Sequence, residues 1–185
     1  PNKREYRRFK VKDVPGNEET PGLIIAANLP RDAANDALVL RPGLSLDAFR
    51  ASKGRGFKIG TNAVRRAAYL RRLFPEAAVI HFRGAADTRV AKLDRGDKQR
   101  LPDGGEVGPA DALVMARSGL ERIGMTSRIV QDFSVREMLP AVGQGALAIE
   151  TRNGGDAAAA VCARLTDETT LRCVTAERAV LRALG

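Results

Sequence analysis

Residues 57–74, FKIGTNAVRRAAYLRRLF, form the stretch that decides the fold. An apolar segment at 57–59 ends at Gly60-Thr61, and a helical pattern follows at once, with apolar residues at positions 63, 67, 70 and 74. Spacings of three and four residues place these side chains on one face of a helix, which Pro75 ends. The sequence therefore predicts a strand that leads directly into an amphipathic helix, with Asn62 as its N-cap.

Short apolar segments and helical patterns alternate along the rest of the chain. We predict strands over 23–29, 37–40, 77–82 and 112–116, and helices over 46–49, 87–93, 119–123, 156–165 and 167–184. This alternation is typical of α/β proteins, in which helices cover the sheets. Residues 97–109 are polar, glycine-rich and without periodicity, so we predict a surface loop or insertion without a chemical role. The basic residues 1–12 predict either a solvated arm or a strand that is cut off from its sheet.

The charge balance indicates the class of ligand. Lys plus Arg number 31 and Asp plus Glu number 22, a net charge of +9, which attracts nucleic acid, phosphate or polycarboxylates alike. With no Trp and two Tyr, the chain lacks the stacking platforms of single-strand binders, so we expect no nucleic-acid partner. No apolar run approaches the roughly 20 residues that cross a bilayer. We expect a cytoplasmic monomer without a membrane partner.

The sequence lacks the residues that several kinds of catalytic site require. His, Cys and acidic residues show no metal-ligand spacing, and no nucleotide-binding glycine loop occurs, so we expect no metal site. The one histidine, His81, is expected to be structural, so the sequence offers no histidine for a catalytic triad. The two cysteines, Cys162 and Cys173, are spaced like neither a disulfide scaffold nor a metal site, and we predict that both are buried.

Arginines are placed where they favour an anion. Arg65 and Arg66 fall in the first turn of the predicted helix, where the helix dipole disfavours cations by roughly 0.3 to 1 kcal/mol unless an anion compensates. Free backbone N–H groups, the Thr61 hydroxyl and two guanidinium groups make a receptor for carboxylate or phosphate. The other interpretation is that both arginines point to solvent or pair with acids elsewhere.

A second pair of arginines follows the next predicted strand. Arg83-Gly84 comes directly after 77–82, and Arg89 lies near the start of the next helix. Ligands of open α/β sheets bind at the carboxyl ends of the strands. If the two strands are parallel neighbours, four guanidiniums converge on one crevice and can hold several carboxylates.

Several motifs together resemble the porphobilinogen deaminase family. Residues 60–66, followed by Leu70-Arg71-Arg72, resemble its G-T-S-S-x-R-R helix, and Arg83-Gly84 to Arg89 with Lys92-Leu93-Asp94 resembles its R-G-N-x-x-T-R…K-L-D segment. Residues 118–124, 139–146 and 175–178 resemble further blocks of the family in the same order. The resemblance runs from about Lys12 to the last residue.

The resemblance implies a three-domain α/β enzyme whose first two domains have mixed sheets like those of periplasmic binding proteins. Residues 1–38 and 140–164 would be a remnant of domain 1, residues 39–139 would form domain 2, and residues 165–185 would be the first helix of domain 3. Part of the first domain and most of the third would then be missing from this sequence.

The family condenses four porphobilinogen molecules head to tail on a dipyrromethane cofactor, with loss of ammonia, to give hydroxymethylbilane for haem and other tetrapyrroles. By this resemblance Asp13 matches the catalytic aspartate, which stabilises the positive charge left when ammonia departs. The residues matched to carboxylate binding are Lys12, Arg65, Arg66, Arg83, Gly84, Arg89 and Arg122, with hydrogen bonds from Thr61 and Asn62.

The chain departs from the family pattern at several places. Phe9-Lys10 replaces His-Ser, Asn62-Ala63 replaces Ser-Ser, Ala85 replaces Asn, and 97–109 contains an apparent insertion. The cysteine that holds the cofactor would fall about three positions beyond Gly185, and neither cysteine of this chain matches it. An alternative function is therefore a non-catalytic module that binds polycarboxylates.

Overall fold

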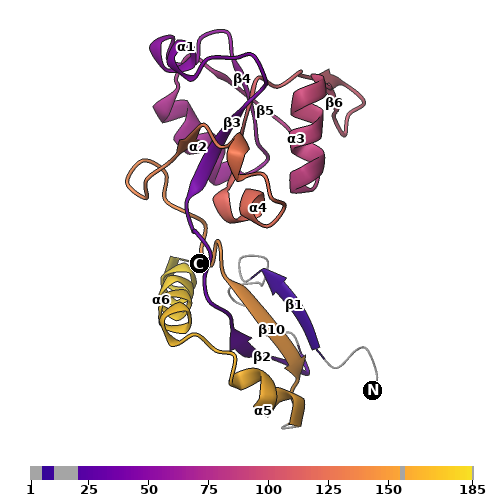
Figure 1. Ribbon diagram of the computed structural model, residues 1–185, viewed down its shortest axis with the longest axis vertical. Helices are drawn as coiled ribbons and strands as arrows, with labels where there is room; N and C mark the ends of the chain where they lie inside the picture. Colours follow the sequence, from indigo (N-terminus) through magenta and orange to yellow (C-terminus); the bar gives the residue numbers. More distant parts are fainter. Residues whose placement is uncertain (1–5, 11–20, 155–156, 185) are drawn as a thin grey trace. The chain divides into compact units, whose positions relative to one another are not determined.

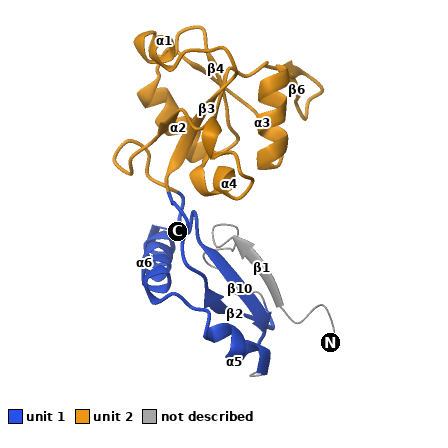
Figure 2. Ribbon diagram, viewed as in Figure 1, with its two compact units in different colours: residues 1–34, 141–185 blue, residues 35–140 orange. Residues whose placement is uncertain are grey.

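The structure is a computed structural model that describes residues 6–10, 21–154 and 157–184, with the backbone alone for 6–10. The chain forms two compact units, residues 1–34 with 141–185 and residues 35–140 (Figure 2). Each unit is described by itself below. Lys12 and Asp13 lie outside the described residues.

The second unit is built on a mixed sheet of five strands. The order is β5-β4-β8-β3-β9, with bounds β5 Ala78–Ile80, β4 Lys58–Gly60, β8 Ala112–Ala116, β3 Asp36–Leu40 and β9 Gln131–Asp132. Strand β4 runs parallel to both β5 and β8, whereas β3 is antiparallel to β8 and β9. The predicted α/β class with a mixed sheet is confirmed.

Helices cover both faces of this sheet (Figure 1). Side chains of β3 and β8 alternate between two cores, because successive residues of a strand point to opposite faces. Leu38 of β3 packs with Phe49 of α1 (Leu46–Ala51) and Leu70 of α2 (Val64–Leu73). Val39, on the opposite face, packs with Leu93 of α3 (Ala86–Arg95), and α4 (Arg117–Glu121) and the 3-10 helix η2 (Thr126–Arg128) follow β8. Burial on both faces explains why these strands are continuous apolar runs.

The first unit has a three-stranded antiparallel sheet. Strand β10 (Leu147–Arg152) lies between β1 (Tyr6–Lys10) and β2 (Leu23–Asn28). Helix α5 (Ala157–Ala163) contributes Cys162 to a small core with Ala27 and Ile149. The strand expected among the basic N-terminal residues is thus present at 6–10, but it pairs with β10 and is not cut off from a sheet, which corrects that part of the prediction.

Helix α6 (Glu168–Leu184) is held to the first unit mainly by polar contacts. Val174 is buried, and Glu177 pairs with Arg31 while accepting a hydrogen bond of 2.7 Å from the Gly143 N–H. Cys173 is exposed, so its predicted burial is wrong. We also expected Cys173, Ala176, Val180 and Leu184 to form the apolar stripe of this helix, but all four are exposed, and the buried residues of α6 are Thr170 and Val174.

Two further predictions are corrected. Residues 97–109 are not an irregular loop, because they contain the hairpin of β6 (Gln99–Arg100) and β7 (Glu106–Val107), in which Gln99 is buried. Asn62 is not the N-cap of α2; Ala63 occupies that position without a side-chain cap, since the Asn62 side chain bonds elsewhere. The assignment of residues 165–185 to a third domain stays a prediction; by its contacts α6 groups with the first unit.

Gly60, the last residue of β4, is required by close packing. A Cβ at this position would lie 2.7 Å from Leu113 Cδ2 and 2.8 Å from Phe82 Cβ, both parts of buried side chains. Neither neighbour can withdraw without disturbing the core between the sheet and α3. The glycine therefore allows β4 to lie directly against this layer.

We expect Gly60→Ala to lower the free energy of unfolding of the second unit by about 1–3 kcal/mol, the usual cost of overpacking a core. Gly119→Ala is the matched control, because a Cβ there meets nothing within 4 Å and the residue lies in α4. Alanine in a helix should leave stability unchanged or higher. Urea unfolding of both variants checks this; equal stabilities would contradict the packing argument.

Candidate anion-binding site

The turn between β4 and α2 is built from side chains that bond to its backbone. The Thr61 N–H donates to the Ile80 carbonyl at 3.0 Å, and the Thr61 hydroxyl accepts from the Ala63 N–H at 3.2 Å. Asn62 Oδ1 accepts from the Phe82 N–H at 2.9 Å, which ties the turn to the residues after β5. These bonds fix the backbone from which α2 and its two arginines begin.

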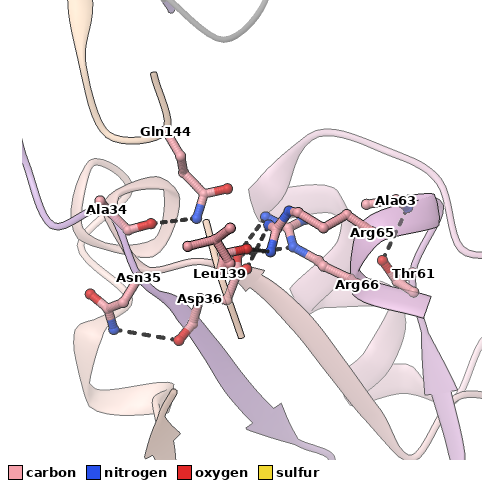
Figure 3. A network of polar contacts seen from close by, with 9 residues as sticks. All are labelled: Ala34, Asn35, Asp36, Thr61, Ala63, Arg65, Arg66, Leu139 and Gln144. Atoms are coloured by element: carbon pink, nitrogen blue, oxygen red, sulfur yellow. Dashed lines mark hydrogen bonds and ion pairs between the residues drawn. The ribbon is translucent and has the colours of Figure 1, made fainter. Parts of the chain in front are cut away.

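Arg65 and Arg66 both pair with Asp36, the first residue of β3 (Figure 3). Arg65 Nη2 lies 2.6 Å from Oδ2 of the carboxylate, and Arg66 lies 2.8 Å from Oδ1 through Nη2 and 3.0 Å through Nε. Arg65 Nη1 also donates to the Leu139 carbonyl. The Asp36 side chain is 0% exposed, so this carboxylate bridges two guanidiniums out of contact with water.

The sheet topology explains why these residues meet. Strands β4 and β5 are parallel, so their carboxyl ends lie at the same edge of the sheet, where α2 and α3 begin. Strand β3 is antiparallel to β8, and Asp36 at its start pairs with Ala116 at the end of β8. An acidic residue at the start of β3 is thereby placed at the edge where the arginines gather.

Arg89 brings a third guanidinium close to this pair. Burial lowers the pKa of Arg89, and the nearby positive charge of Arg66 lowers it further. Its Nε is buried and has no hydrogen-bond partner among the residues that the structure describes. Because an arginine does not deprotonate in proteins, this unfavourable charge favours an anion that accepts from Nε.

The local charge also favours an anion. Among the contacts of the described residues, Arg65 and Arg66 share the Asp36 carboxylate and Arg89 lies near Arg66, which leaves positive charge in excess among these four side chains. The first turn of α2 contains no acidic residue. The partial positive charge of a helix N-terminus adds to the excess. Arginine binds planar carboxylates through two parallel hydrogen bonds, so a carboxylate suits this site well.

The other predicted site residues lie at different positions. Arg83 is exposed directly after β5, and its backbone N–H donates to Gln99 Oε1 at 3.2 Å. Gly84 has a φ of +138°, a backbone conformation that other residues rarely adopt. Arg122 is exposed at the C-cap of α4, and its backbone N–H bonds to Ser118. The structure thus brings together Arg65, Arg66 and Arg89.

Sequence reasoning missed two residues of the site. Asp36 directly precedes a predicted apolar strand, a position that is typical of a cap or turn residue. No local pattern indicates that its partner lies 30 residues further along the chain. Gln99 falls in a segment predicted to have no role. A polar residue that ends or interrupts an apolar pattern was the one available signal in each case.

Comparison with known proteins gives the family. The family described as "Porphobilinogen deaminase, dipyromethane cofactor binding domain" matches residues 9–160. The chain belongs to the porphobilinogen deaminase family. The resemblance inferred from the sequence motifs is confirmed.

Curated relatives agree with this assignment. Porphobilinogen deaminase of Burkholderia thailandensis is 43% identical over 175 residues, which are 95% of this chain and 48% of the relative. Porphobilinogen deaminase 2 of Streptomyces coelicolor is 41% identical over 94% of this chain and 51% of its own length. The chain therefore spans about half the length of the curated relatives it matches.

Solved structures resemble the chain only distantly. A TRAP periplasmic solute-binding protein from Roseobacter denitrificans, with bound β-D-glucuronate, has a TM-score of 0.42 and 14% identity, covering 89% of this chain and 50% of its own. YhfZ from Shigella flexneri has a TM-score of 0.36 and 11% identity, covering 97% and 72%.

The described residues form neither a metal-binding group nor a membrane-spanning helix. Within 6–10, 21–154 and 157–184, His, Cys, Asp and Glu form no group of three that could bind a metal ion. No helix in the same ranges combines the length and the apolar character needed to cross a membrane.

We expect Asp36→Asn to lower the free energy of unfolding by about 3 kcal/mol, because removing one partner of a buried ion pair leaves the other charges uncompensated. The asparagine amide would also direct N–H groups at guanidinium donors. Asp94→Asn is the matched control, since Asp94 pairs with Arg128 while its side chain is 35% exposed. That pair should contribute below about 1 kcal/mol. Urea unfolding measures both, and similar losses would refute the special role of Asp36.

Proposed function

We propose that this chain carries the carboxylate-binding part of a hydroxymethylbilane synthase. That enzyme condenses four porphobilinogen molecules head to tail; each step breaks an aminomethyl C–N bond, forms a C–C bond between pyrroles and releases ammonia. Every porphobilinogen carries an acetate and a propionate side chain, so the growing chain is a polyanion that fixed guanidiniums can bind. Arg89, a partly buried cation whose Nε lacks a partner in the described part of the chain, is the observation that supports the proposal most.

Each arginine has a proposed role. Arg65 and Arg66, held by Asp36, present guanidinium N–H groups in a fixed orientation, and Arg89 donates from its buried Nε. A guanidinium carries five N–H donors, so an arginine that is bound to Asp36 can still donate to a ligand. Arg83, Gly84 and Arg122 are proposed to bind further carboxylates, with Thr61 and Asn62 shaping the turn or bonding to the ligand.

Lys12 and Asp13 complete the proposal. Lys12 would bind a carboxylate, and Asp13 would stabilise the positive charge that develops on the pyrrole as ammonia leaves. Cytoplasmic location and a monomeric state belong to the same proposal.

The dipyrromethane cofactor fits these residues. Each of its pyrroles carries carboxylates, and the buried Nε of Arg89 requires an acceptor. When bound, the cofactor supplies the pyrrole carbon to which the first porphobilinogen is joined. Arg65, Arg66 and Arg89 would hold its carboxylates. Cys162 is buried in α5, where a thiol is a poor nucleophile. Cys173 is exposed on α6, at a position that does not match the cofactor cysteine of the family, so we propose that covalent attachment needs a cysteine outside these 185 residues.

The alternative is a non-catalytic module that binds polycarboxylates. It is favoured by the same cysteine placement and uses the same arginines. Both proposals predict that this chain binds porphobilinogen, and they differ in turnover. Ammonia release by a protein that contains this chain together with the cysteine-bearing loop supports the synthase, whereas binding without ammonia release in that protein supports the module.

We expect Arg89→Met to weaken the binding of porphobilinogen at least about tenfold, the loss of a hydrogen bond to a charged group. The stability of the protein should stay equal or rise, because the substitution removes a buried cation without a partner for its Nε. Calorimetric titration and urea unfolding measure the two effects.

Arg71→Met is the matched control, since Arg71 is exposed on α2 and lies outside the predicted site. It should leave affinity nearly unchanged apart from a small effect of net charge. An Arg89→Met variant that binds like the wild type, or a wild type that binds no porphobilinogen, would overturn the proposed site.

A further inference from the structure

Gln99 is the buried side chain of a mostly exposed hairpin. Its relative exposure is 4%, whereas Arg100 beside it and residues 102–106 at the tip are exposed. The hairpin closes through its own backbone, with Gln99 paired to Val107 and Arg100 to Glu106, and with Leu101 N–H bonded to the Gly105 carbonyl at 2.7 Å. The amide of Gln99 is not needed for that closure and points to another segment.

That segment is the loop that follows β5. Gln99 Oε1 accepts from the Arg83 N–H at 3.2 Å and from Lys92 Nζ at 3.5 Å, while its Nε2 donates to the Lys98 carbonyl at 3.1 Å. Both ends of the amide therefore have partners, which fixes its orientation. A buried amide bonded at both ends is costly to move.

Two successive backbone amides after β5 are thus bound by side-chain amide oxygens. The Phe82 N–H bonds to Asn62, from the turn that carries Arg65 and Arg66, and the Arg83 N–H bonds to Gln99, from the hairpin. Gly84, at a φ of +138°, turns the chain directly afterwards. The backbone of Arg83 is consequently held from two sides at the point where its side chain leaves the loop.

We propose that Gln99 is a positioning residue that orders Arg83 for carboxylate binding, so that the hairpin 97–109 belongs to the binding apparatus. The identity of the ligand rests on the proposed function, whereas the ordering of Arg83 rests on the geometry alone. Gln99 acts through the Arg83 backbone and contributes no contact to the ligand.

Amide hydrogen exchange, resolved at Arg83, tests the ordering without any ligand. We expect Gln99→Leu, which removes the acceptor, to speed exchange of the Arg83 N–H about tenfold, the loss of one hydrogen bond. Gln99→Glu keeps an acceptor beside Lys92 and should preserve protection. Arg100→Ala, on the same hairpin, should change nothing. Unchanged exchange at Arg83 in a folded Gln99→Leu variant overturns the inference, whatever the chain binds.

A double-mutant cycle tests the consequence for binding. We expect Gln99→Leu to weaken porphobilinogen binding about three- to tenfold in the wild-type background and to have no effect in the Arg83→Ala background, because its influence passes through Arg83. Equal effects in both backgrounds would mean a general structural role and would refute positioning. If the wild-type chain binds no porphobilinogen, the proposed function fails, and the exchange measurement still decides whether Gln99 orders Arg83.

Discussion

A single buried carboxylate organises the candidate site. Asp36 is fully buried and binds Arg65 and Arg66, which otherwise would repel each other and the positive end of α2. A buried charge is tolerated only when it is paired, so each partner depends on the others. Among these three residues the carboxylate offsets one of the two positive charges, and Arg89 adds a further positive charge close to Arg66. The arginines are therefore ordered in advance while the site still attracts anions, which is how preorganisation lowers the cost of binding.

The mixed sheet is the reason that this carboxylate is available. In the parallel part, β5-β4-β8, the carboxyl ends of the strands share one edge, and helices begin there. Such an edge collects helix N-termini and favours anions, so it does not by itself stabilise closely spaced arginines. Strand β3 runs the opposite way, so its first residue reaches the same edge. The antiparallel strand β3 thus supplies the counter-charge for the arginines at this edge.

The sequence predicted most elements of the second unit because local patterns determine them. The helical spacing of residues 63–74 and the apolar run 112–116 need no knowledge of the rest of the chain, and both elements lie where predicted. Strand β10 was not predicted, because its buried positions include Glu150 and Thr151, which hide the apolar pattern. Asp36 and Gln99 were missed for a related reason. Their partners are distant in sequence. The direction of β3 depends on its pairing with β8 and β9, which no local sequence pattern indicates.

Three of the departures from the family pattern lie around one loop, the connection from β5 to α3. Asn62 stands where the pattern has Ser, and its longer side chain reaches the Phe82 N–H. Ala85 stands where the pattern has Asn, and it occupies the N-cap of α3 without a side-chain hydrogen bond. The hairpin of β6 and β7, in the segment where the resemblance implies an insertion, supplies Gln99 for the Arg83 N–H. No side chain caps the end of the loop at Ala85, whereas Asn62 and Gln99 bind its beginning. The loop is therefore held by hydrogen bonds at Phe82 and Arg83. Asn62 and Gln99, which are distant in the sequence, therefore act on neighbouring backbone amides of one loop, those of Phe82 and Arg83.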